Sequence, residues 1–229
     1  MPKNNPSSFL LLFLMAVSIF GLALVPILLT QPNLQAETSP MRKPLISTIY
    51  SIICIGGIIA VFYPNKCRIL FQKPKVTIDT EERSTSELPF KGHHPNCENF
   101  ANNRIITRYA IYCAACTGLL IGAIAALVGA VLFSLGFFAG AGNLWVLAVG
   151  EGLMLAGLTQ IKMRNYAKAT VNALFVIGSF IILVAADLIG QSLLVDAYVL
   201  ALTVFMLWFR ILLSEWNNKR TCIACGRCI

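Results

Sequence analysis

The sequence predicts an all-α integral membrane protein, a bundle of six transmembrane helices with a cytoplasmic metal-binding loop and a Cys-rich C-terminal tail. Composition is the first reason, because 12% of the 229 residues are charged and 57% are hydrophobic. About 25% are charged in a typical soluble domain. The second reason is a set of long uncharged runs, since about 20 apolar residues in a helix cross the hydrocarbon core. These runs are continuous, whereas the strands of a membrane β-barrel alternate polar and apolar residues.

The first of the six runs, residues 9–29, has two interpretations. Ala36 offers a small residue for cleavage of a secretory signal peptide, which would leave five spans. We expect the run to be retained as a helix, because it is long for a signal core and Leu34 is a poor partner for Ala36. The second run, residues 45–63, contains Gly56 and Gly57, which favour close contact between helices.

The remaining runs cover residues 109–135, 144–161, 169–189 and 193–213. In the third run a small residue recurs at every fourth position, which predicts a smooth face that a neighbouring backbone can approach closely. In the last run, Arg210 is expected to extend its charged end to the membrane surface. The small residues of the third run are Gly118, Gly122, Ala126 and Ala130.

The distribution of basic residues predicts the orientation. Sixteen of the 18 lysines and arginines fall on one side of the six runs, and only Arg42 and Lys43 fall on the other. Because basic loops stay in the cytoplasm, we expect a multi-pass protein of the cell membrane with both termini cytoplasmic. The net charge of +8 then serves orientation and attraction to anionic lipids of the bilayer, not binding of nucleic acid.

The predicted organisation has four parts. Residues 1–63 hold the first two helices, and residues 64–108 form a cytoplasmic loop whose second half carries the metal-ligand segment. Residues 109–213 form a four-helix transmembrane region, and residues 214–229 form the Cys-rich cytoplasmic tail.

Four residues in two pairs have the spacing of a zinc knuckle. His94 and Cys97 are separated by two residues, as are Cys113 and Cys116, and 15 residues lie between the pairs. Thiolate and imidazole ligands suit zinc, and the start of a helix at Cys113 and Cys116 favours thiolates. His93 is a spare ligand. The alternative is that these two cysteines pack against a neighbouring helix while the histidines are solvated.

The tail carries a second cluster, Cys222, Cys225 and Cys228, spaced as in the first part of an iron–sulfur run. A fourth ligand would come from Cys67 or Cys97. Two other interpretations remain open: Cys222 and Cys225 join the knuckle cysteines Cys113 and Cys116 in a four-cysteine zinc site, or the tail holds free thiols near the membrane, which are candidates for acylation. Disulfides are rare in the reducing cytoplasm, so clustered cysteines there indicate metal or redox chemistry. Cys54, inside a span, is expected to be a small buried apolar residue.

Three acidic residues lie in or next to the apolar runs. Glu151 lies near the middle of the fourth run, where an ionisable residue is costly and is a functional hypothesis by default. The alternative is a structural role, in which Glu151 is protonated or hydrogen-bonded and faces a polar side chain of a neighbouring span. Asp187 and Asp196 lie at the outer ends of their runs and are expected to be solvated. The partners expected for Glu151 are Gln160, Asn172 and Thr203.

Residues 93–122 resemble a family of prokaryotic, mostly archaeal, polytopic membrane proteins whose domain has no assigned function. The shared pattern is a His and a Cys followed by Cys-Ala-x-Cys-Thr-Gly at the start of a helix, with a later Gly. Here it falls on His93 or His94, Cys97, Cys113 and Cys116. The resemblance implies a membrane protein with a metal-binding motif and implies no reaction. The three-cysteine tail is not part of the pattern.

The preferred function is a scaffold or accessory subunit of a membrane complex, with zinc setting its cytoplasmic surface. No phosphate-binding loop, dinucleotide fingerprint or nucleophile elbow is present, so no catalytic residue is identified and an enzyme is not favoured. Three alternatives remain. They are a redox protein with an iron–sulfur cluster on the tail, a thiol oxidoreductase using Cys113 and Cys116, and a transporter of ions or small solutes using Glu151.

Overall fold

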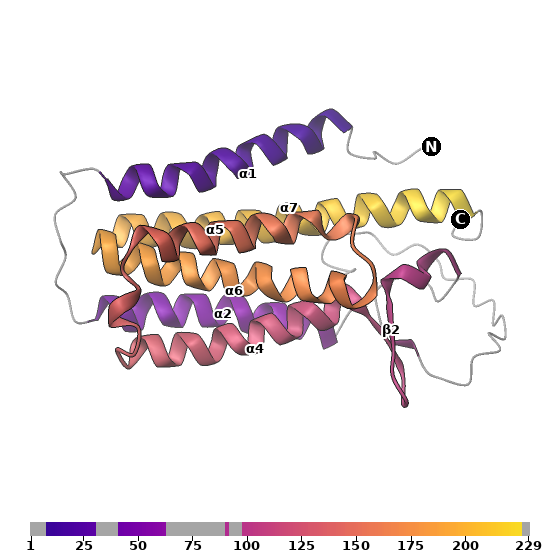
Figure 1. Cartoon of the computed structure of the whole chain (residues 1–229), viewed down its shortest axis with the longest axis horizontal. Coiled ribbons are helices and arrows are strands. Elements are labelled where there is room, and N and C mark those ends of the chain that lie inside the picture. Colours follow the sequence, from indigo (N-terminus) through magenta and orange to yellow (C-terminus); the bar gives the residue numbers. More distant parts are fainter. Residues whose placement is uncertain (1–7, 31–40, 63–89, 92–97, 226–229) are drawn as a thin grey trace.

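The computed structural model describes residues 8–30, 41–62, 90–91 and 98–225. Within them, six helices are long and apolar enough to cross a membrane, which confirms a helical, multi-pass membrane protein. Figure 1 shows these helices side by side, with their axes roughly aligned. The helices are α1 (Ser8–Leu29), α2 (Arg42–Phe62), α4 (Ala114–Ser134), α5 (Leu144–Leu158), α6 (Asn165–Gly190) and α7 (Leu193–Cys225).

Successive helices run in opposite directions, so the bundle has two distinct ends (Figure 1). We call one the basic end: α4 and α6 begin there, α5 and α7 finish there, and a small sheet lies beside it. The opposite end holds the start of α2, the start of α7 and the short 3-10 helix η2 (Ala139–Ala141). The start of α1 and the finish of α7 both lie at the basic end, as an even number of spans requires.

Helix α6 is the centre of the bundle. Inside its apolar window 61% of residues are buried, the largest share among the six helices. Helices α4, α5 and α7 all contact it. Because so little of α6 faces outward, polar residues on it must find partners inside the protein.

The contact between α4 and α6 confirms the predicted small-residue face. A Cβ atom added to Gly118 would lie 2.1 Å from the backbone oxygen of Ala169, and one added to Gly122 would lie 2.7 Å from that of Ala173. The two backbones therefore touch, as small residues allow. The same prediction for Gly56 and Gly57 is wrong, because a Cβ atom on either would meet nothing within 4 Å.

A three-stranded sheet precedes α4 and corrects the predicted start of the third span. Its order is β1 (Phe90–Lys91), β3 (Ile111–Cys113), β2 (Arg104–Ile106), with β1 parallel and β2 antiparallel to β3. Strands β2 and β3 form a hairpin whose turn is closed by hydrogen bonds between Thr107 and Ala110. Residues 109–113 therefore belong to the hairpin, and the helix begins at Ala114.

Helix α7 is longer than predicted and takes in much of the expected tail. It continues to Cys225, because neither Gly nor Pro interrupts the sequence before Gly226. Within this extension the guanidinium of Arg220 lies 4.7 Å from the centre of the Trp216 ring, an i, i+4 pair that supports the helix. Helix α7 also contacts the 3-10 helix η1 (Glu98–Asn103).

Candidate functional site

Cys113 and Cys116 lie together at the basic end, where β3 passes into α4. Cys113 is the last residue of β3 and the N-cap of α4, with extended backbone angles. The prediction that both cysteines occupy helical turns is thus correct only for Cys116. Cys113 is 5% exposed and Cys116 is half-buried. Their thiols are close enough to share a hydrogen bond.

Local contacts fix the two thiols against the first turns of α6. The hydroxyl of Thr117 donates to the backbone oxygen of Cys113 at 3.0 Å, which ties the strand to the helix. Ala114 packs with Ile105 of the hairpin and Ala169 of α6 in a small apolar cluster. Gly118 lets the α4 backbone touch Ala169 of α6. The cysteines are therefore held close to the α6 residues that flank Ala169.

Lys168 of α6 is one of two buried cations near the thiols. Its side chain is 6% exposed, and its ammonium donates to Oδ1 of Asn103 in η1 at 2.7 Å. The charge of Lys168 interacts electrostatically with Cys113. This ammonium lies in the first turn of α6, at the positive end of the helix dipole, a position that disfavours a cation unless an anion is near.

Arg210 of α7 is the second buried cation. It was expected to reach the membrane surface, but its side chain is 3% exposed and points into the bundle. It donates to Oε1 of Gln160 at 3.0 Å and to Oδ1 of Asn172, and its guanidinium lies 5.3 Å from the centre of the Phe175 ring. Its charge interacts with both Cys113 and Cys116. Polar side chains of α6 and of the short 3-10 helix η3 (Thr159–Ile161) thus replace solvent around this cation.

We call the two cysteines and three nearby polar residues the thiol site: Cys113, Cys116, Lys168, Asn172 and Arg210. In the part of the chain that the structure describes, neither cation of the site forms an ion pair with a carboxylate. The helices α4 and α6 also both begin here, so their dipoles add positive potential.

The other predicted metal ligands are not placed by the structure. His94 and Cys97 lie outside the described residues, as do His93, Cys67 and Cys228. Cys222 and Cys225 belong to the last turns of α7, but only their backbone is described. Among the described residues, no three His, Cys, Asp or Glu side chains gather as metal ligands. The four-ligand knuckle and the tail cluster therefore stay predictions.

Glu151 does not have the partners predicted for it. It lies on α5, half-buried, and its Oε1 has no hydrogen-bond partner among the described residues. Gln160 and Asn172 both bind Arg210, while the hydroxyl of Thr203 donates to the backbone oxygen of Val199 at 2.9 Å. Two of the three predicted partners, Gln160 and Asn172, therefore bind a cation that was predicted to lie at the membrane surface.

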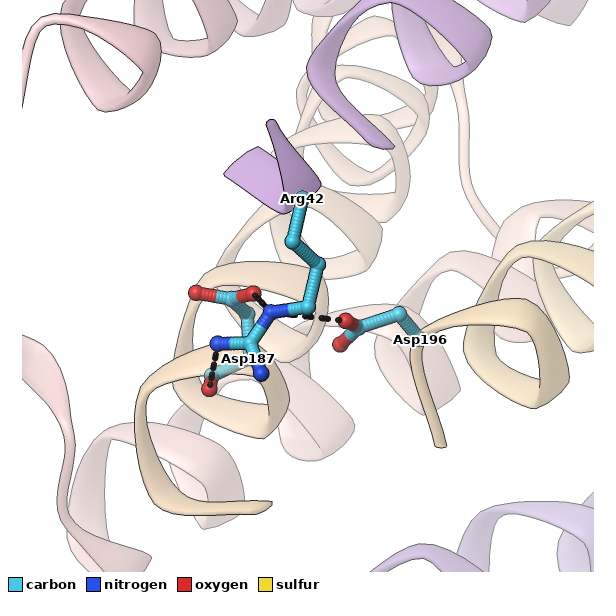
Figure 2. Close-up of polar contacts among 3 residues, drawn as sticks. All are labelled: Arg42, Asp187 and Asp196. Atoms are coloured by element: carbon cyan, nitrogen blue, oxygen red, sulfur yellow. Dashed lines mark hydrogen bonds and ion pairs between the residues drawn. The ribbon is translucent and has the colours of Figure 1, made fainter. Parts of the chain in front are cut away.

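An ionic cluster at the end of the bundle opposite the basic end was not predicted from the sequence. Asp187 and Asp196, which were expected to be solvated, are both 0% exposed. Both lie beside the guanidinium of Arg42 (Figure 2). The signal in the sequence was that Arg42 and Lys43 are the only basic residues on that side. Any buried carboxylate there has few possible partners.

Comparison of the chain with protein-family models, with curated proteins and with solved structures finds no match. The resemblance of residues 93–122 to an archaeal membrane family stays a prediction, and function must be argued from the residues themselves.

Proposed function

We propose that the chain is a scaffold or accessory subunit of a membrane complex whose basic end carries a structural zinc ion and faces the cytoplasm of the cell. Cys113 and Cys116 supply two thiolates, and His94 and Cys97 complete the tetrahedral site. One observation carries the proposal: the two thiols lie together, close to the buried cations Lys168 and Arg210. Zinc in such a closed site stabilises structure and leaves no open position for catalysis.

The charge of the expected zinc site fits its surroundings. Three thiolates and one neutral imidazole around Zn²⁺ give a net charge of −1. A buried negative charge is stable only beside a positive one, and Arg210 and Lys168 supply that charge without competing carboxylates among the described residues. The hairpin and η1 contact the same end of the bundle, so an ion at this point would hold the soluble face of the protein to the membrane helices.

Elemental analysis and an absorption spectrum of anaerobically purified protein test the proposal. We expect a colourless protein with about one tightly held zinc per chain, or about two if the tail binds metal separately. The double variant Cys113→Ser/Cys116→Ser should lose one zinc, while Cys54→Ser, which removes a buried thiol far along α2, should lose none. Visible absorption that bleaches on reduction would indicate an iron–sulfur cluster on the tail instead.

A second candidate function is thiol–disulfide exchange, favoured by the contact between the two thiols. Attack of one thiolate on a disulfide of a partner protein would form a mixed disulfide, and attack by the second would release the reduced partner. Cys113 and Cys116 would then share a disulfide, having given two electrons to the partner. This function requires metal-free cysteines, so it predicts purified protein without zinc and a dithiol that alkylation traps only after reduction.

A further inference from the structure

A cavity of about 330 Å³ lies between α5, α6 and η2, at the end of the bundle opposite the basic end. This volume is near the lower limit for pockets that hold a small ligand. Every described residue that lines the cavity is apolar or aromatic, and none of them turns a polar atom toward it. We call it the apolar cavity. Its lining includes Phe138, Ala141, Trp145, Val149, Phe180 and Val184.

Close contacts hold one wall of the apolar cavity in place. The centre of the Phe180 ring lies 5.8 Å from that of Phe138, in an edge-to-face arrangement, and 5.9 Å from that of Tyr50. The same ring meets α4, where a Cβ atom added to Gly129 would lie 2.6 Å from Cε1 of Phe180. With neighbours on α2, α4 and the segment before η2, this ring has little room to swing into the cavity and close it.

The rim of the apolar cavity faces outward from the bundle. The side chains of Trp145 and Val149 on α5 are 84% and 56% exposed, whereas Val184 on α6 is buried. Both helices are long and apolar enough to cross a membrane, so the exposed rim contacts the hydrocarbon of the bilayer. Trp145 is the second residue of α5, and tryptophan is enriched where a membrane meets water. The cavity therefore opens just below the membrane surface, to the leaflet opposite the basic end.

The chemistry of the lining decides among the possible occupants. A buried water molecule needs about two to four polar partners, and the described lining offers none. A peptide segment or a ligand with a polar ring would leave its polar groups unpaired there. An empty cavity would forfeit the dispersion contacts of its walls. A hydrocarbon chain restores those contacts without any hydrogen bond, and the bilayer supplies such chains at the rim.

We propose that the apolar cavity binds one acyl chain of a phospholipid from the leaflet opposite the basic end. The lipid is held through its chain, so the cavity itself does not select a headgroup. Because the walls belong to α5, α6 and η2, the bound chain fills a gap between these elements. It therefore makes more contacts, and exchanges more slowly, than the lipids that only surround the bundle.

Trp145 is the reporter in the test, which uses the full-length protein after Trp208→Phe and Trp216→Phe have removed the other two tryptophans. The protein in detergent micelles is titrated with phosphatidylcholine that carries bromine on one acyl chain, and quenching of the Trp145 fluorescence is measured. A bound chain predicts quenching that saturates at about one phospholipid per protein chain. Phosphatidylglycerol and phosphatidylethanolamine with the same chains should bind within about threefold of this affinity, because no polar group of the lining selects a headgroup.

Ala141→Leu narrows the apolar cavity from η2. Ala139→Leu is the matched control, since Ala139 belongs to the same 3-10 helix but is exposed and outside the lining. The apparent Kd should rise about tenfold or more in Ala141→Leu and stay within about twofold in Ala139→Leu. Should Ala141→Leu not fold, Val149→Phe narrows the cavity from the exposed rim and carries the same expectation.

Three results would overturn the proposal. The first is quenching that rises in proportion to the brominated lipid without saturation, as lipids that only surround the bundle would give. The second is equal affinity in the cavity-narrowing variant and in Ala139→Leu. The third is an affinity set by the headgroup, which would place the bound lipid at a polar site elsewhere on the protein.

Discussion

The guanidinium of Arg42 forms an ion pair with Asp187, 145 residues away in the sequence, and both side chains are buried. This pair connects the start of α2 to the last turn of the central helix α6. Since Asp196 of α7 lies on the other side of the same guanidinium, one cation holds three helices at the end of the bundle opposite the thiols.

Arg42→Gln should therefore strongly destabilise the protein. Removing one partner of a buried ion pair leaves uncompensated charge, which typically costs about 3–5 kcal/mol. The free energy of unfolding in mixed detergent micelles measures the effect. Lys43→Gln is the control, because the ammonium of Lys43 lies over the Phe133 ring and the loss of such a contact should cost about 1 kcal/mol or less. Equal effects of the two variants would show that Arg42 is not a structural link.

Gly118→Ala should weaken the contact between α4 and α6. The added Cβ would meet the backbone oxygen of Ala169 at 2.1 Å, and neither backbone can move aside freely. Overpacking of this kind costs about 1–3 kcal/mol, measurable as a lower thermal midpoint. In Gly152→Ala, on α5, the new Cβ meets nothing within 4 Å, so that variant should be neutral or slightly stabilising. The opposite order of stabilities would contradict the close helix contact.

Arg210→Met should disturb the thiol site without touching a cysteine. It leaves Gln160 and Asn172 without their shared donor, which costs about 1–3 kcal/mol for each unsatisfied group. It also removes a charge near both thiols, so zinc should be released to a chelator faster. Arg210→Lys should recover part of both losses, and Arg220→Gln, which removes an exposed cation of α7, should match wild type in zinc release. Unchanged zinc release in Arg210→Met would show that the charge of Arg210 does not stabilise the bound metal.

The two thiols should differ in reactivity once metal is removed. Cys113 is 5% exposed, while Cys116 is half-buried, so a maleimide needs a larger local opening to reach Cys113. We expect Cys116 to react about tenfold faster, corresponding to about 1.4 kcal/mol in opening free energy. Mass spectrometry of peptides after timed labelling measures both rates in one sample. Faster labelling of Cys113 would contradict the placement of the strand–helix junction.

The orientation predicts opposite accessibility for two exposed positions at the two ends of the bundle. Asn143, just before α5, lies at the opposite end, and Arg164, just before α6, lies at the basic end. In intact cells, a membrane-impermeant maleimide should label Asn143→Cys and not Arg164→Cys. The reverse pattern would place the basic end outside and contradict a cytoplasmic thiol site.

The helices were predictable from the sequence because apolar runs of membrane length have few alternatives. The hairpin at residues 104–113 was not, because strands of three residues beside an apolar run read as an extension of the helix. The predicted last span ends before helix α7 does, for a related reason: the last turns of α7 are polar, and hydropathy does not detect polar helical turns. The stripe at Gly118 and Gly122 was recognised by its spacing, although its partner α6 was not.

Buried polar pairs were the part that sequence reasoning could not supply. Arg210 was assigned to the surface and Asp187 to solvent because charged side chains near the ends of spans usually have those positions. Only the packing of distant segments shows that Asn172 lies beside Arg210, and that Arg42 lies beside Asp187. By contrast, the spacing of Cys113 and Cys116 was informative by itself, since it places two thiols within one turn of a helix start.

X-ray absorption spectroscopy at the zinc edge of the anaerobically purified protein tests the central claim most directly, because it counts the atoms bound to the metal. A zinc ion at the thiol site predicts a first shell of three sulfurs and one nitrogen. In Cys113→Ser/Cys116→Ser this signal should disappear or fall to one sulfur. Zinc bound only by nitrogen and oxygen, or a sulfur shell unchanged in the double variant, would contradict the account.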